Sequence, residues 1–163
     1  MRNPFVKNVA NDIGWAAVWL AQHKTKGYPI HYEQIRPFSV EFTFPHFIDC
    51  SGFVAWCYRI AGAPDPYKLG YAGIGNTQML LDKGTEIPLS KVRPGDVVVY
   101  AKGRPLSEQH AAVIVQKGAD PLTISQGMEG DPSFVRVSQD GRKPTYLRFD
   151  TSLKWKPIPL PKP

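Results

Sequence analysis

The spacing of apolar residues changes partway along the chain, and this change limits the folds that the sequence can adopt. Residues 4–22 and 51–61 place apolar side chains every three to four positions, which predicts two amphipathic helices. From about residue 92 onward, short apolar runs alternate with glycine, proline and aspartate, as in strands joined by turns. Helices followed by an antiparallel meander make an α+β fold.

The second half of the chain is expected to supply about five strands, and a short helix at 77–82 precedes them. Residues 24–48 separate the two long helices and are rich in proline and aromatic side chains, which predicts a long loop. Loops of that length are often functional. The expected strands are 97–100, 111–116, 122–126, 134–137 and 146–149.

A chain of 163 residues is long enough for one domain with a sizeable core. We expect this domain to cover residues 1–153. Residues 154–163 are rich in proline and are expected to form an extended tail, either a linker or a flexible end. No internal repeat divides the chain further.

Composition and charge narrow the classes of partner. No stretch approaches the roughly 20 apolar residues of a membrane span, and the first 20 residues lack the layout of a signal peptide. The net charge of +6 favours acidic partners: nucleic acid, an anionic membrane surface or the acidic polymers of a bacterial wall. No nucleic-acid-binding motif or dense basic run occurs, so nucleic acid is not expected. The alternative is that the spread charges only solubilise the fold.

The chain has two cysteines, Cys50 and Cys57, seven positions apart on a predicted helix. That spacing separates them by roughly 10 Å, whereas a disulfide needs Cα atoms within about 7 Å. Both thiols are therefore expected to be free. The cysteines and the scattered histidines show no zinc-site spacing, so no metal is expected.

Cys50 stands where a helix begins. Asp49 and Ser51 on either side are residue types that cap helix N-termini. A helix N-terminus and a nearby imidazole lower the pKa of a thiol and favour the nucleophilic thiolate. Helical spacing puts Cys50 on the side that faces the core, so the thiol is expected to look into a cleft. The alternative is a small buried core residue, a common fate for a cysteine.

Four histidines are candidates for the base that would activate Cys50. His110 starts the apolar run at 111–116, where a polar side chain can project from the end of a sheet into a cleft. An ordinary surface histidine is the alternative at such a position. The other three are His23, at the end of the first helix, and His31 and His46, in the irregular segment.

Hairpin geometry supplies a partner for this histidine. If 111–116 and 122–126 pair around the turn at 117–121, facing residue numbers sum to about 238, and His110 lies near Gln126. The Gln126 oxygen could then accept the Nδ1 hydrogen and leave Nε2 facing the thiol. Gln126 facing solvent is the alternative, and Glu129 in the following loop is the competing orienting residue.

Four segments together resemble the NlpC/P60 peptidases. Residues 49–54 (DCSGFV) resemble the D-C-S-G-[LF]-[VT] signature of that family, and 93–100 (RPGDVVVY) resemble its P-G-D-hydrophobic strand. Residues 110–115 (HAAVIV) resemble its histidine strand, and 125–127 (SQG) sit where the family places a third polar residue. Their order and spacing are more specific than any one motif.

The resemblance implies a papain-like fold in which a helix bearing Cys50 packs on an antiparallel sheet bearing His110. It implies that Cys50 attacks a carbonyl carbon, that His110 serves as base and then acid, and that Gln126 orients the imidazole. The backbone N–H of Cys50 and the hydroxyl of Tyr32, or of Tyr28 as the alternate, would stabilise the oxyanion. No metal or organic cofactor is implied. The family often has histidine in the third position, so Gln126 is a departure.

The substrate implied by the resemblance is the stem peptide of bacterial peptidoglycan, cleaved by a monomer. Residues 31–37 and 62–66 resemble the branch carried by bacteriophages and their endolysins, which would be made in the cytoplasm and released to the wall. Export by another route is the alternative. Two other functions stay open: a non-catalytic wall-binding or structural module of the same fold, and an acyl or amide transferase that uses the same thioester.

Overall fold

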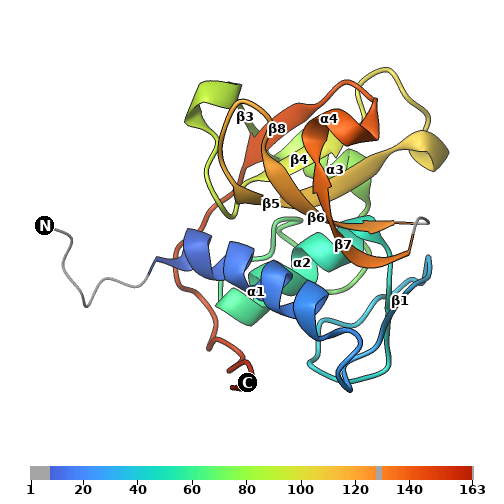
Figure 1. Ribbon diagram of the computed structural model, residues 1–163, viewed down its shortest axis with the longest axis vertical. Helices are drawn as coiled ribbons and strands as arrows, with labels where there is room; N and C mark the ends of the chain where they lie inside the picture. The colour runs from blue at the N-terminus through green and yellow to red at the C-terminus, as the bar shows by residue number, and fades with distance from the viewer. Residues whose placement is uncertain (1–7, 128–129, 163) are drawn as a thin grey trace, which may run out of the picture.

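A computed structural model describes residues 8–127 and 130–162 and shows two layers (Figure 1). In one layer α1 (Val9–His23) and α2 (Cys50–Ala61) lie side by side, and in the other a six-stranded antiparallel sheet packs against them. Two shorter helices follow, α3 (Thr77–Lys83) and α4 (Val137–Asp140). The predicted α+β class is confirmed.

The sheet has the strand order β3-β8-β4-β5-β6-β7. Strands β4 to β7 form the expected meander, but β8 returns to lie between β3 and β4. The expected count of about five is one short, because the exposed three-residue strand β3 shows no apolar run. The strands are β3 (Thr85–Ile87), β4 (Val97–Tyr100), β5 (His110–Gln116), β6 (Leu122–Gly127), β7 (Gly130–Arg136) and β8 (Thr145–Arg148).

The segment 24–48 is not wholly irregular, as the sequence had suggested. It contains β1 (Ile30–Tyr32) and β2 (His46–Ile48), which pair in parallel as a separate two-stranded sheet. The register places Tyr32 opposite Ile48, two residues before the first residue of α2. This pairing brings the loop to the N-terminal end of α2.

Both faces of the central strands are buried, which is why β4 reads as a continuous apolar run. The face toward α1 and α2 carries Val97, Val99 and Val113 against the main core, while Val98 and Ile114 point into a smaller core on the other face. Each fully buried valine or isoleucine contributes about 1.5–3 kcal/mol. The ends of β4 and β5 are therefore held firmly in place.

Helix α1 begins at Val9, where the Asn8 side chain accepts a hydrogen bond from the Asn11 backbone N–H. The helix was expected to start at residue 4, and residues 1–7 lie outside the described part of the chain. Within residues 8–127 and 130–162, no helix has the length and apolar character needed to cross a membrane.

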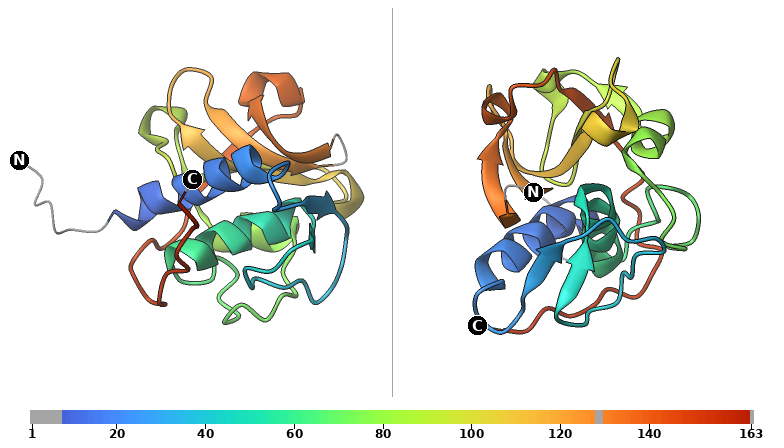
Figure 2. Two further views of the ribbon diagram at one scale, coloured as in Figure 1. Left: turned by 60° about the horizontal axis from the view of Figure 1, so that its bottom comes forward. Right: turned by 90° about the vertical axis from the view of Figure 1, so that its right-hand side faces the viewer.

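The proline-rich C-terminal segment is extended, as expected, but it is bound to the helices (Figure 2). The backbone N–H groups of Lys154 and Trp155 donate to the Gly62 carbonyl, at 2.8 and 2.9 Å. The Trp19 indole N–H donates to the Pro161 carbonyl at 3.2 Å. These contacts place the segment against α1 and α2, and its role as a linker or a flexible end stays a prediction.

Candidate active site

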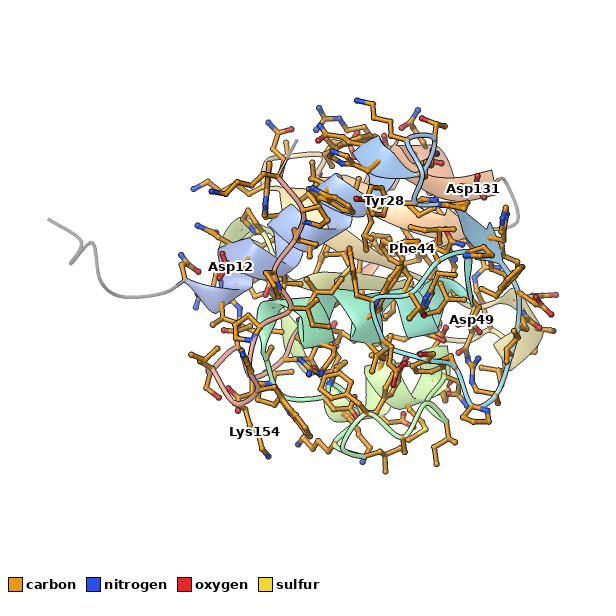
Figure 3. The ribbon with its side chains drawn as sticks, turned by 90° about the horizontal axis from the view of Figure 1, so that it is seen from below. Asp12, Tyr28, Phe44, Asp49, Asp131 and Lys154 are labelled. Atoms are coloured by element: carbon orange, nitrogen blue, oxygen red, sulfur yellow. The ribbon has the colours of Figure 1, made fainter. Side chains whose placement is uncertain are left out.

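The N-terminus of α2 is capped by Asp49, which lies at the right-hand end of the helix in Figure 3. Its Oδ1 accepts hydrogen bonds from the Gly52 backbone N–H at 2.9 Å and from the Ser51 hydroxyl at 3.1 Å. This is the capping role expected of an aspartate before a helix. Cys50 is consequently the first residue of the helix, as predicted from its neighbours.

Arg36 fixes the preceding loop to this cap. Its Nη2 donates to Asp49 Oδ2 at 2.8 Å and to Ser51 Oγ at 3.2 Å, and its Nε donates to the Gly75 carbonyl at 2.9 Å. The Tyr67 hydroxyl donates to the Ser51 carbonyl at 2.8 Å. The first turn of α2 is thus held by groups from two different loops.

Cys50 is buried, with 7% of its surface exposed. Its sulfur lies 3.9 Å from the hydroxyl oxygen of Thr77, the first residue of α3. The backbone N–H groups of Ser51 and Ala111 also interact with the sulfur and favour its charged form. Ala111 directly follows His110 on β5, so the thiol meets the sheet one residue from the candidate base.

Burial raises the pKa of Cys50 to about 11, and the neighbouring Asp49 carboxylate adds to the increase. The hydrogen bonds from Ala111, Thr77 and Ser51 act in the opposite direction and offset only part of it. The expectation of a depressed pKa is therefore wrong, because loss of solvent outweighs the helix N-terminus. A raised pKa favours the protonated thiol at neutral pH.

His110 is the first residue of β5 and is 8% exposed. Its Nε2 lies 2.7 Å from the Ser125 hydroxyl on β6. Its ring is parallel to that of Tyr100 on β4, with centroids 6.1 Å apart and an interplanar angle of 8°. Strands on both sides of β5 therefore orient the imidazole.

Gln126 does not orient His110, which corrects the sequence prediction. The pairing of Ala112 with Ser125 makes facing numbers sum to 237 rather than 238, and alternation puts Ser125 on the His110 side of the sheet. The Gln126 amide donates instead to the Ile48 carbonyl at 3.3 Å, and its Oε1 accepts no hydrogen bond from the part of the chain that the structure describes. The ring nitrogen that meets β6 is Nε2, not Nδ1 as expected.

The structure separates the two tyrosine candidates. Tyr32 lies on β1 opposite Ile48, and its hydroxyl accepts a hydrogen bond from Gln34 Nε2 at 3.1 Å. Tyr28 packs edge-on against Trp19 and Phe44, with ring centroids 4.9 and 5.1 Å apart (Figure 3). Tyr28 therefore belongs to an aromatic cluster away from the Asp49 cap. Of the two tyrosines, Tyr32 lies nearer to the start of α2 and stays the candidate for the oxyanion. Glu129 lies outside the described residues.

The remaining histidines have other partners. His46 is buried, which lowers its pKa, and stacks on Trp56 with ring centroids 3.8 Å apart. His23 stacks on Trp19 at 4.1 Å, and His31 lies 4.0 Å from the Asp131 carboxylate. Among the described residues, no group of three or more histidine, cysteine or acidic side chains could hold a metal ion.

Sequence reasoning missed three residues that shape this site. Thr77 is 27 positions from Cys50 and shows no signal that predicts contact. Arg36 lies in a segment without recognisable periodicity. Ser125 could have been found, because a hairpin register shorter by one residue pairs it with Ala112 and so places it, in place of Gln126, on the same face of the sheet as His110.

Comparisons with known proteins agree with the motifs. The NlpC/P60 family profile matches residues 36–131, more than half of the chain. The chain is 29% identical over 102 residues to the probable endopeptidase Mb2213c of Mycobacterium bovis, and equally to the probable endopeptidase Rv2190c of Mycobacterium tuberculosis. Each match covers 63% of this chain, and the matched segment spans 22% of the relative's length.

Solved structures show the same fold. The chain resembles the structure of NlpC2 from Trichomonas vaginalis with a TM-score of 0.55 at 16% identity, over 93% of this chain and 51% of that one. It resembles a structure of the Resuscitation Promoting Factor Interacting protein RipA with a TM-score of 0.50 at 16% identity, over 90% of this chain and 67% of that one. By family profile and by fold, the chain belongs to the NlpC/P60 family.

Proposed function

We propose that this chain is a cysteine peptidase that hydrolyses an amide bond in the stem peptide of bacterial peptidoglycan. One observation carries the proposal. The Cys50 thiol, at the capped start of α2, meets the backbone N–H of Ala111, next to His110, and the His110 imidazole is bonded to Ser125. Endopeptidase names among the relatives support a peptidase role.

Because burial raises the pKa of Cys50, the thiol needs a base, and we assign that role to His110. The imidazole takes the thiol proton, and the thiolate attacks the carbonyl carbon of the scissile amide. The backbone N–H of Cys50 and the Tyr32 hydroxyl stabilise the oxyanion, in place of solvent. Ser125, rather than Gln126, holds the imidazole while it carries the proton.

The tetrahedral intermediate then collapses, and the C–N bond breaks. His110 gives its proton to the leaving amine, and Cys50 is left as a thioester. Water, deprotonated by His110, attacks the thioester, releases the acid product and restores the thiol. These steps call for no metal or organic cofactor.

The biological setting is part of the same proposal. The motifs at 31–37 and 62–66 support the bacteriophage endolysin branch, in which a monomer made in the cytoplasm is released to the wall. The net charge of +6 suits an acidic wall peptide.

Purified peptidoglycan digested with Cys50→Ala tests the function. We expect cleavage to be abolished, while the free energy of unfolding stays within about 1–2 kcal/mol of the parent. Cys57→Ala is the matched control: Cys57 is buried on the same helix, two turns from Cys50, and should leave turnover nearly intact. Mass spectrometry of the fragments identifies the cleaved bond.

Equal turnover by Cys50→Ala would refute the proposal. Binding of peptidoglycan without any cleavage by the parent protein would favour a wall-binding module. Transfer of the acyl group to an added amine, at the expense of the free acid, would identify a transferase.

A further inference from the structure

Asp140, the last residue of α4, forms an ion pair with Arg142, and α4 lies on the face of the sheet opposite α1 and α2 (Figure 1). Arg142 Nε and Nη2 donate to the two carboxylate oxygens of Asp140 at 2.6 and 2.7 Å. Arg142 Nη1 donates to the Glu108 carbonyl at 3.1 Å. The Asp140 side chain is 10% exposed, whereas that of Arg142 is 29% exposed.

The guanidinium of Arg142 keeps two donors for a ligand. It has five N–H groups, and three of them make the hydrogen bonds above. Within residues 8–127 and 130–162 the side chain has no further hydrogen-bond partner, so one N–H remains on each of Nη1 and Nη2. A carboxylate can accept from two guanidinium N–H groups through its two oxygens, and these two N–H groups are available to it.

Tyr100 links this ion pair to the candidate base. The Arg142 guanidinium carbon lies 5.3 Å from the centre of the Tyr100 ring, and the same ring is stacked with His110. Electrostatic interactions also link Asp140 to Arg142 and to His110. Burial opposes ionisation of Asp140, but Arg142 and, to a smaller extent, His110 bring its pKa below the ordinary value.

The influence of Arg142 extends to the nucleophile. The hydrogen bond with Asp140 is the main cause of the raised pKa of Arg142, and a negative charge on Cys50 adds to it. The placement of Arg142 near the reacting groups rests on the contacts of its guanidinium with the Tyr100 ring and of that ring with His110. Asp140 also fixes the plane of the guanidinium, so little side-chain freedom is lost when a ligand binds.

Arg36 shows what a purely structural arginine looks like in this chain. Four of its five donors are already used, on Gly75, Ile35, Asp49 and Ser51. Its guanidinium therefore lacks two unused N–H groups for a carboxylate. The number of unused N–H donors thus distinguishes Arg36, which stabilises a loop, from Arg142, which can bind a ligand.

We infer that Arg142 binds a carboxylate of the peptide substrate and positions that peptide against Cys50 and His110. The inference rests on the proposed function and adds a specificity residue to it. Arg142 lies after residue 131, beyond the part of the chain that the family profile covers. The ligand is a carboxylate because its two oxygens can accept from the two unused N–H groups.

The test compares synthetic stem peptides in which each carboxylate in turn is replaced by a carboxamide. For one position we expect the parent protein to cleave the free acid at least about tenfold better, measured as kcat/KM, because a hydrogen bond to a charged group is lost in the amide. Arg142→Met should reduce this ratio to about one by slowing cleavage of the acid. Arg142→Lys should keep part of the preference.

Arg148→Met is the matched control. Arg148 makes the same forked contact, with Asp96, and is also 29% exposed, but Asp96 precedes β4 whereas Tyr100 ends it. The ratio of kcat/KM for the acid to kcat/KM for the amide should be the same in Arg148→Met as in the parent. The parent's own preference and the Arg142→Lys ratio keep the test decisive if Arg142→Met fails to fold.

Equal cleavage of every acid and amide pair by the parent would overturn the inference while leaving the proposed function intact. An equal loss on both peptides in Arg142→Met would overturn it as well, because that result marks a structural role. If the parent cleaves none of the peptides but Cys50-dependent digestion of peptidoglycan is seen, the inference fails alone. If neither is cleaved, the proposed function fails and the inference falls with it.

Discussion

The two halves of the candidate site are built differently. At the start of α2, the groups around Cys50 are organised by a helix cap: Asp49 caps the first turn and binds Arg36, and Thr77 of α3, 27 positions from Cys50, contacts the sulfur. At the start of β5, the orientation of His110 depends on Tyr100 of β4 and Ser125 of β6. The pairing register of the sheet places both residues beside the imidazole.

This difference separates a site held by a helix cap from one held by the pairing register of a sheet. A capped helix start is encoded by a few adjacent residues, so changes there should act first on stability. The orientation of an imidazole by the next strand depends on a pairing register, and a register error of one residue exchanges one face for the other. Changes at the His110 end should therefore affect catalysis more than folding.

The largest effect on the helix side is expected from Asp49→Ala. The substitution removes the acceptor for the Gly52 N–H and the charge partner of Arg36. Loss of a cap costs about 1 kcal/mol. With the loss of a partly buried ion pair, we expect the free energy of unfolding to fall by about 2–3 kcal/mol, measured by urea denaturation.

Asp49→Asn is the control, because it keeps an acceptor for the Gly52 N–H and loses only the charge. It should cost less stability than Asp49→Ala, and it should lower the pKa of Cys50 by removing the neighbouring negative charge. A stability change within about 0.5 kcal/mol in Asp49→Ala would mean that the cap does not hold the start of α2.

A smaller effect, on activity, distinguishes Ser125 from Gln126. Ser125→Ala removes the hydroxyl that meets His110 Nε2. We expect kcat/KM to fall about tenfold, equivalent to about 1.4 kcal/mol. Gln126→Met removes an amide whose Oε1 has no partner among the described residues, and the Ile48 carbonyl that accepts from its Nε2 also accepts from the Glu33 backbone N–H, so both activity and stability should stay close to those of the parent.

Steady-state kinetics of the two variants show which substitution lowers kcat/KM more, and thermal unfolding checks that both variants are folded. The reverse result, a large loss of activity in Gln126→Met and none in Ser125→Ala, would restore Gln126 as the orienting residue. It would also mean that catalysis does not follow the β5–β6 register.

Local signals in the sequence predicted much of the fold. The period of apolar residues predicted α2 and β4 almost to the residue, because both lie in the core. Strand β3 and the parallel pair β1 and β2 were missed, since each is three residues long and depends on its partner strand. The insertion of β8 beside β4 is a matter of topology that no local pattern encodes.

The site divides in the same way. Cys50 at a helix start and His110 at a strand start follow from adjacent residues, and the structure has both positions. The direction of the Cys50 pKa could not be predicted, because it depends on burial by α3 and β5. Ser125 was missed by one residue of register, and Thr77 and Arg142 have no local signal.

The central claim is that His110 takes the proton from Cys50, and the pH dependence of Cys50 alkylation by iodoacetamide tests it most directly. Only the thiolate reacts, and burial raises the pKa of Cys50 to about 11. In His110→Ala, alkylation should therefore be slow at pH 7 and rise about tenfold per pH unit toward that value. The parent has the same raised pKa at rest, but it should react faster at neutral pH because the imidazole removes the thiol proton as the sulfur attacks, and peptide mapping should locate the label on Cys50. Identical pH profiles for the two proteins would contradict the claim.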